Sequence, residues 1–169
     1  EAEAAPAAPA LQHRLLAESS DEEAAAGGDD MQECVRVMES EQLPSGVLLC
    51  VSAGSVLHFG NGTEWPRAST AVVNAANTGG LRGGGIDGAF VSAGGEALRE
   101  DREKLPLLPD SRDRIPEGGA RSTGPNKYGS LFARTVIHAV GPRYPGYASD
   151  FQEEDETLRR AYADTLRVA

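Results

Sequence analysis

Short apolar runs separated by turn residues mark the predicted strands of this chain. Two runs, 34–38 and 47–51, flank a loop that contains Pro44 and Gly46, and this arrangement predicts an antiparallel pair. The apolar character of the second run continues through Leu57, so the second strand is expected to extend that far.

Two later runs predict strands inside a sheet. Residues 71–73 form an unbroken apolar segment that ends at Asn74, which is typical of a strand buried on both faces. Residues 134–140 form a second strong strand, ended by Gly141 and Pro142. The turn residues that follow each run fix where these strands stop.

Helical periodicity predicts two helices, 86–102 and 152–169. One side of the first helix carries Ile86, Ala89, Phe90, Ala93, Ala97 and Leu98. One face of the second helix carries Leu158, Ala161, Tyr162, Thr165 and Leu166. Between them, the turn-rich segment 104–124 predicts a long loop with one short element at most. Strands that alternate with helices predict an α/β fold, with a mainly parallel sheet covered on both sides.

Charge separates the first 30 residues from the rest. Residues 1–30 hold eight acidic residues and one basic residue, so most of the net charge of −10 lies there. We interpret this Ala/Glu/Gly-rich segment as a flexible, solvated tail, or in part as a remnant of a secretion vector, because Glu-Ala-Glu-Ala is typical of one. The folded domain is predicted to span 31–169.

Composition excludes several classes of function. The nearly balanced body has no clustered Lys and Arg for duplex nucleic acid, and no apolar run is long enough for a bilayer. An intracellular, soluble protein is therefore expected. Cys34 and Cys50 are interpreted as buried thiols, although a single bridge between neighbouring strands stays open. Neither they nor the three histidines have metal-ligand spacing, and we expect no cofactor.

The most informative segment is the glycine-rich run from Val73 to Gly88. A buried strand ends, six glycines follow within a short span, and a helix begins. Glycine lets main-chain amides approach a ligand, and the start of a helix offers unpaired N–H groups with partial positive charge. The pattern therefore predicts a site for a diphosphate. It matches neither the dinucleotide fingerprint nor the Walker loop.

Two blocks of sequence resemble the macrodomain family, especially its ADP-ribosyl-hydrolase branch. The first runs from Asn74-Ala75-Ala76-Asn77 to Gly83-Gly84-Gly85-Ile86-Asp87-Gly88-Ala89, and the second covers 116–124 and 136–142. The resemblance implies a three-layer α/β/α fold, a mixed sheet with helices on both faces. Because the family's next strand and second glycine loop have no counterpart before Ala169, the domain is expected to be partial.

The resemblance also implies roles for individual residues. Asn77 would contact the distal ribose and Asp87 would act as general base or orient the attacking water, so both are candidate catalytic residues. Asn74 would brace the loop or contact the ribose. The remaining predicted ligand contacts are Ser55, Val56, Arg82, Gly83, Gly84, Gly85 and Ile86.

Departures from the family pattern keep alternatives open. Ser55 stands where the family has the aspartate that reads adenine, and Arg82 replaces the first glycine of the loop. Arg82 is either a solvated residue or a phosphate contact. Asp87 is a catalytic carboxylate or a residue that serves the helix dipole. His138 is expected to be a satisfied core histidine rather than a chemical group.

The sequence leaves three functions open. In the first, the chain is an enzyme that binds ADP-ribose and hydrolyses ADP-ribosyl esters, of mono-ADP-ribosylated protein or of O-acetyl-ADP-ribose. Alternatively it is a non-catalytic reader of ADP-ribose, or a scaffold subunit that has lost the pocket. The expected partners are ADP-ribose or ADP-ribosylated protein. Self-association or a protein partner is also expected at the sheet surface left exposed by a partial domain.

Overall fold

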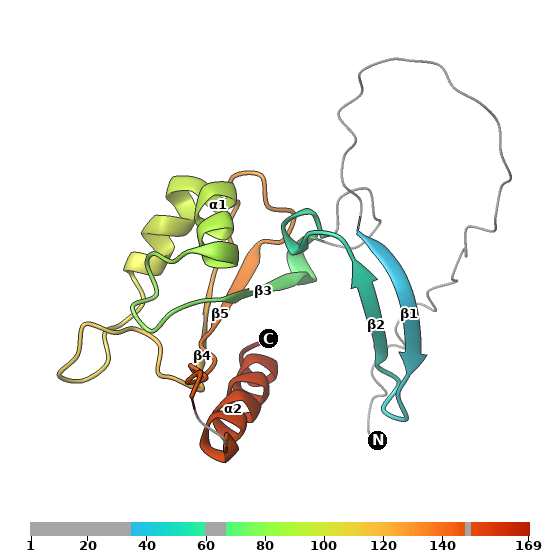
Figure 1. The fold of residues 1–169 in the computed structure, drawn as a ribbon. Helices are drawn as coiled ribbons and strands as arrows, with labels where there is room; N and C mark the ends of the chain where they lie inside the picture. The colour runs from blue at the N-terminus through green and yellow to red at the C-terminus, as the bar shows by residue number, and fades with distance from the viewer. Residues whose placement is uncertain (1–34, 60–66, 148–149) are drawn as a thin grey trace, which may run out of the picture. The chain divides into compact units, whose positions relative to one another are not determined.

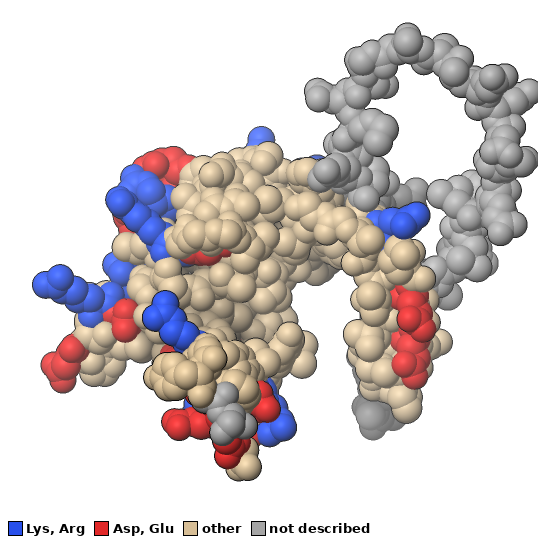
Figure 2. All heavy atoms as spheres, in the orientation of Figure 1, with Lys and Arg blue, Asp and Glu red and all other residues tan. Residues whose placement is uncertain are grey.

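The computed structural model describes residues 35–59, 67–147 and 150–169. Predictions for the acidic segment 1–30, for the domain boundary near Met31 and for Cys34 lie outside these ranges. Within them, no helix is both long enough and apolar enough to cross a bilayer. On the face drawn in Figure 2, basic and acidic side chains are interspersed, in keeping with the nearly balanced charge of the body.

The predicted antiparallel pair is confirmed. Strand β1 (Arg36–Gln42) pairs with β2 (Leu48–Ala53), with Ser40 opposite Cys50. The prediction that the second strand reaches Leu57 is wrong. Gly54 takes a φ of 123°, which ends the strand, and Ser55 then caps the short 3-10 helix η1 (Val56–His58) by accepting a bond from the Leu57 amide at 3.3 Å. Within the described residues, Cys50 is a partly buried free cysteine.

A second sheet has the strand order β3-β5-β4. Strand β3 (Ala71–Ala75) runs parallel to β5 (Thr135–Ala139), and β4 (Ala120–Thr123) is antiparallel to β5. Strand β4 is the one short element expected within 104–124. Asn74 lies opposite His138 in the parallel register, so these two side chains share a face of the sheet.

Helix α1 (Gly85–Glu103) is broken at Gly95, whose φ of 62° and ψ of −156° are not helical. The helix predicted for 86–102 is confirmed in its bounds, but the kink was not predicted. The kink divides α1 into two helical segments (Figure 1). The kink falls at a glycine because only glycine reaches positive φ easily. The break frees the carbonyl of Ala93, which accepts a hydrogen bond from the Ser130 amide at 2.9 Å.

The main core lies between α1 and one face of the β3-β5-β4 sheet. Phe90 and Leu98 of α1 are fully buried, as are Val136 of β5 and Tyr128 of the preceding loop. Partly buried residues of η1, including Val56, pack at the edge of this cluster. The core therefore anchors both segments of the broken helix.

Helix α2 (Gln152–Val168) covers the opposite face, which completes the predicted three-layer α/β/α arrangement (Figure 1). Its buried residues are Thr157, Ala161 and Thr165, spaced four apart. The five residues predicted to share a face do so, since all of them line one groove, although Tyr162 is 68% exposed and Leu166 is 79% exposed. The exposed flank borders an apolar groove of about 430 Å³.

Candidate functional site

The glycine-rich loop joins the end of β3 to the start of α1, and its residues 82–86 are exposed. Gly84 is the N-cap of α1 and offers no side-chain cap, and the bond from the Gly88 amide to the Gly84 carbonyl is 3.4 Å long. The amides of Gly85 and Ile86 precede that bond, so they have no acceptor inside the helix. An exposed, uncapped helix start with its partial positive charge is suited to an anion.

The glycines of this loop serve different purposes. Gly85 has a φ of 57°, a conformation that side chains rarely adopt. A Cβ at Gly83 would collide with the carboxylate of Asp87. The sequence predicted close approach of a ligand to this backbone, whereas at Gly83 it is the protein's own carboxylate that requires the missing side chain.

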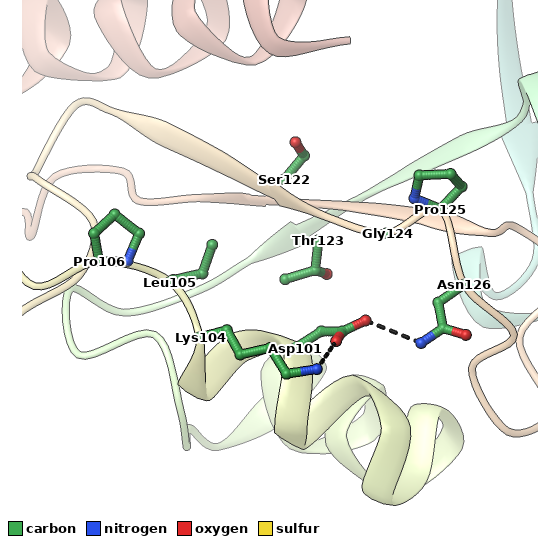
Figure 3. A pocket seen from close by; sticks show the side chains of 9 residues that line it. All are labelled: Asp101, Lys104, Leu105, Pro106, Ser122, Thr123, Gly124, Pro125 and Asn126. Atoms are coloured by element: carbon green, nitrogen blue, oxygen red, sulfur yellow. Dashed lines mark hydrogen bonds and ion pairs between the residues drawn. The ribbon is translucent and has the colours of Figure 1, made fainter.

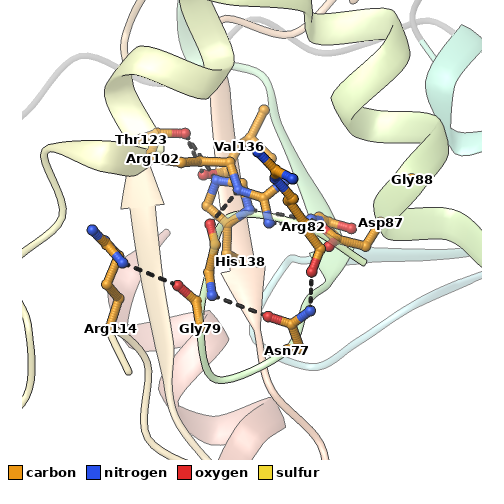
Figure 4. A network of polar contacts seen from close by, with 12 residues as sticks. Asn77, Gly79, Arg82, Asp87, Gly88, Arg102, Arg114, Thr123, Val136 and His138 are labelled. Carbon is orange, nitrogen blue, oxygen red and sulfur yellow. Dashed lines mark hydrogen bonds and ion pairs between the residues drawn. The ribbon is translucent and has the colours of Figure 1, made fainter. Parts of the chain in front are cut away.

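Asn77 holds the loop together with both ends of its side-chain amide. Its Nδ2 donates to the carbonyl of Arg82, and its Oδ1 accepts from the Gly80 amide at 3.1 Å (Figure 4). Asn77 and the Arg82 side chain are both exposed, at the rim of the loop. The structure thus brings together these two predicted site residues and gives Asn77 a bracing role.

Asp87 points into the protein, where it forms a buried polar cluster with Asn74 and Arg102. Asp87 is 2% exposed and the other two are fully buried. Its Oδ1 accepts from Asn74 Nδ2 at 2.6 Å and from Arg102 Nη2 at 2.8 Å, which completes a buried ion pair. The bracing role considered for Asn74 agrees with this geometry, since the amide contacts the carboxylate at the start of α1.

His138 extends the cluster from β5. Burial, reinforced by the positive charge of Arg102, lowers the pKa of His138 to about 3, while Asp87 acts in the opposite direction. The ring is therefore neutral near pH 7. Because Asn74 Nδ2 is a donor, Nδ1 of His138 accepts at 3.2 Å, and Nε2–H donates to Thr123 Oγ1 at 3.0 Å. The interpretation of His138 as a satisfied core histidine is confirmed.

The cluster leaves three buried polar atoms without a hydrogen-bond partner among the described residues: Asn74 Oδ1, Asp87 Oδ2 and Arg102 Nη1. Asp87 Oδ2 lies beside the Cα of Gly83, under the exposed loop. The free lone pairs of the carboxylate are therefore directed towards the loop and not towards the core.

The two remaining predicted contacts belong to η1. The hydroxyl of Ser55 is used to cap this short helix, and Val56 is partly buried at the edge of the core. Because this hydroxyl only accepts in the cap, its O–H can still donate a hydrogen bond.

Sequence reasoning missed Arg102. A signal was present, because Asp87, Phe90, Gly94, Leu98 and Arg102 follow one another at helical spacings of three and four and are all buried. In an uninterrupted helix, however, the 15 positions between Asp87 and Arg102 would put the two charges about 22 Å apart, so the stripe alone does not predict their ion pair. Thr123 was missed as well, although it lies in the second block of the family resemblance, 116–124.

A separate cavity of about 310 Å³ lies where the end of α1 approaches the end of β4 (Figure 3). On one side, Asp101 accepts bonds from Lys104 at 2.8 Å, Asn126 at 3.0 Å and Tyr128 at 2.8 Å. The hydrogen bond from Lys104, followed by those from Asn126 and Tyr128, lowers the pKa of Asp101 to about 2. This carboxylate fastens loop 124–128 to α1.

Comparison with known proteins identifies the class. The family model for the macro domain matches residues 73–169, and this chain belongs to that family. The resemblance seen in the glycine-rich run is thereby confirmed.

Relatives and solved structures place the chain more closely. It is 45% identical over 100 residues to the macro domain-containing protein in the gbd 3' region of Cupriavidus necator, covering 59% of this chain and 52% of the relative. It is 36% identical over 112 residues to the O-acetyl-ADP-ribose deacetylase of Escherichia coli K12, covering 66% and 58%. The chain thus spans about half the length of the curated relatives it matches.

The solved Oceanobacillus iheyensis macrodomain with ADP shares the fold. It matches with a TM-score of 0.56 at 24% identity, covering 80% of this chain and 62% of that one. The predicted α/β macrodomain fold is confirmed.

Proposed function

We propose that this chain binds ADP-ribose. The diphosphate lies on the exposed amides of 83–86, and the distal ribose lies beside Asn77. The observation that carries this proposal is the exposed start of α1, which has no side-chain cap and follows a loop of glycines. The proposal is supported by membership of the macro domain family and by an E. coli relative named for an ADP-ribose ester.

Electrostatics favour an anion at this loop. The carboxylate of Asp87 beneath the loop is matched by the guanidinium of Arg102, and His138 is neutral. The buried cluster therefore adds no net charge under the diphosphate, and the partial positive charge of the helix start stays uncancelled. Ser55 and Val56 remain the predicted contacts at the adenine end.

Isothermal titration calorimetry with ADP-ribose tests this proposal. We expect the wild-type chain to bind and Asn77→Ala to bind at least about tenfold more weakly, because the loop loses its brace and the ribose loses a polar contact. Asn126→Ala is the matched control, since it removes an equally exposed amide at the separate cavity. A folded wild-type chain that produces no heat with ADP-ribose would contradict the proposal and favour the scaffold interpretation.

Hydrolysis of ADP-ribosyl esters is a second candidate. It is favoured by the unpartnered Oδ2 of Asp87, which lies under the loop and is the atom of this carboxylate left to orient or deprotonate water. In the present arrangement this atom is buried, so catalysis would also require that water reaches it.

A measurement of turnover separates a hydrolase from a protein that only binds ADP-ribose. The substrates are O-acetyl-ADP-ribose and a mono-ADP-ribosylated protein, and the measured products are acetate and free ADP-ribose. An enzyme loses its turnover in Asp87→Asn, a change that keeps the shape of the side chain and removes the base. A wild-type chain that binds ADP-ribose and releases neither product is a reader.

A further inference from the structure

Arg102 contacts both ends of the glycine-rich loop with one side chain. Its Nε donates to the carbonyl of Gly80 at 2.5 Å, and its Nη2 donates to Asp87 at 2.8 Å. Gly80 precedes the exposed residues 82–86, and Asp87 follows them directly. The guanidinium is fully buried, so neither contact is shared with solvent in the unliganded chain.

The break in α1 makes this double contact possible. Asp87 and Arg102 are 15 positions apart, and in a straight helix that separation would be about 22 Å, far beyond the reach of a side chain. Gly95 interrupts the helix, so that Arg102 of the second segment can contact Asp87 at the start of the first. The break at Gly95 thus brings the guanidinium of Arg102 under the loop.

Stability alone is a poor explanation for the arrangement. Buried ion pairs repay their desolvation only in part, and apolar residues of similar volume often replace them without loss. Arg102 also retains one unpartnered buried nitrogen, Nη1. The two contacts it does make are both directed at the loop, through a planar fork that fixes the relative position of two acceptors.

We infer that Arg102 is a positioning residue for the diphosphate loop: it holds Gly80 and Asp87 at a fixed separation, so that the amides between them keep the curvature a diphosphate requires. This inference rests on the proposed binding of ADP-ribose. It assigns Arg102 no contact with the ligand, only control of the loop that makes the contact.

The test replaces the planar fork and keeps the charge. Arg102→Lys retains a cation beside Asp87, but a compact ammonium cannot reproduce both bonds of the guanidinium. Arg99→Lys is the control, because Arg99 lies on the same segment and pairs with Glu96 and Glu103 at the surface. We expect ADP-ribose to bind Arg102→Lys at least tenfold more weakly than wild type and Arg99→Lys within twofold of it, at a temperature where all three are folded.

Hydrogen exchange, without ligand, of the backbone amides of Gly80 and Gly88, which donate to the carbonyls of Asn77 and Gly84 at the two ends of the loop, is the second readout. We expect faster exchange in Arg102→Lys and wild-type exchange in Arg99→Lys. If the wild type does not bind ADP-ribose, the proposed function fails, while exchange still decides whether Arg102 orders the loop. Wild-type affinity or wild-type exchange in Arg102→Lys would overturn the inference.

A measurement on the unaltered chain covers the case in which Arg102→Lys does not fold. The Nε–H of Arg102 should be protected from solvent exchange in the nuclear magnetic resonance spectrum, and its resonance should shift when ADP-ribose is added. Rapid exchange of this proton, or a resonance that ADP-ribose leaves unmoved while the ligand binds, would overturn the inference.

Discussion

The two faces of the β3-β5-β4 sheet are covered in different ways. On one face, α1 buries large apolar side chains, such as Phe90 and Leu98, and places a charged pair among them. On the other, α2 buries only Thr157, Ala161 and Thr165, while larger side chains stay exposed beside a groove. Both helices carry apolar residues at helical spacing, so spacing alone does not decide how much surface a helix removes from water.

The difference also concerns chemistry. The face under α1 holds all the polar side chains of the buried cluster, from Asn74 to His138, and it lies next to the glycine-rich loop. The face under α2 presents Val73 and Ala75 to an apolar groove. One face thus positions the candidate site, whereas the other leaves an apolar groove.

The largest expected effect on the free energy of unfolding comes from truncating a buried side chain under α1. Phe90→Ala should lower the free energy of unfolding by about 3–5 kcal/mol, because it leaves a cavity at a fully buried position. Tyr162→Ala on α2 should change it by less than about 0.5 kcal/mol, since that ring is 68% exposed. Urea unfolding measures both. Similar losses in the two variants would show that the faces are equally packed.

An intermediate effect should come from acid. The pKa of His138 in the folded chain is about 3, below its ordinary value of 6.5, so the unfolded chain binds a proton more readily between these values. The free energy of unfolding should therefore fall as pH drops from 6.5 towards 3, by about 2 kcal/mol at pH 5 relative to pH 8.

Urea unfolding at a series of pH values checks this acid sensitivity. His138→Gln should flatten the part of the profile between pH 6.5 and 3, because the titrating group is gone. A wild-type profile that is level across this range would mean that the imidazole is not held neutral by the cluster.

The smallest effect on stability is expected at the other face. Leu166→Asp should change the free energy of unfolding by less than about 0.5 kcal/mol, because Leu166 is 79% exposed. Urea unfolding of wild type and Leu166→Asp measures this difference. A loss well above 0.5 kcal/mol, on the order of 1 kcal/mol or more, would show that Leu166 is packed in the folded chain.

Much of the fold follows from local pattern. The apolar runs before Gly54 and Gly141 predicted strands, and helical periodicity predicted the last helix. The break at Gly95 escaped prediction because single glycines are tolerated in helices, and the apolar stripe continues across it. The exposure of one flank of α2 was not predicted, because periodicity identifies an apolar face without specifying what packs on it.

The candidate site was predicted only in outline. The position of the glycine-rich loop between a strand and a helix followed from the sequence. The inward orientation of Asp87 could not be predicted, because it depends on a partner, Arg102, that the backbone returns to the loop only through the break. Long-range contacts of this kind are set by tertiary structure and leave a weak trace in local pattern.

The break at Gly95 has a consequence for chain length. A single residue inserted between Gly88 and Asp101 would rotate everything after it by about 100° and shift it by about 1.5 Å, which removes Arg102 from the reach of Gly80. The exposed side chains of this segment can be substituted, whereas the number of residues in it cannot change. A library of variants should therefore accept many substitutions there and reject insertions and deletions.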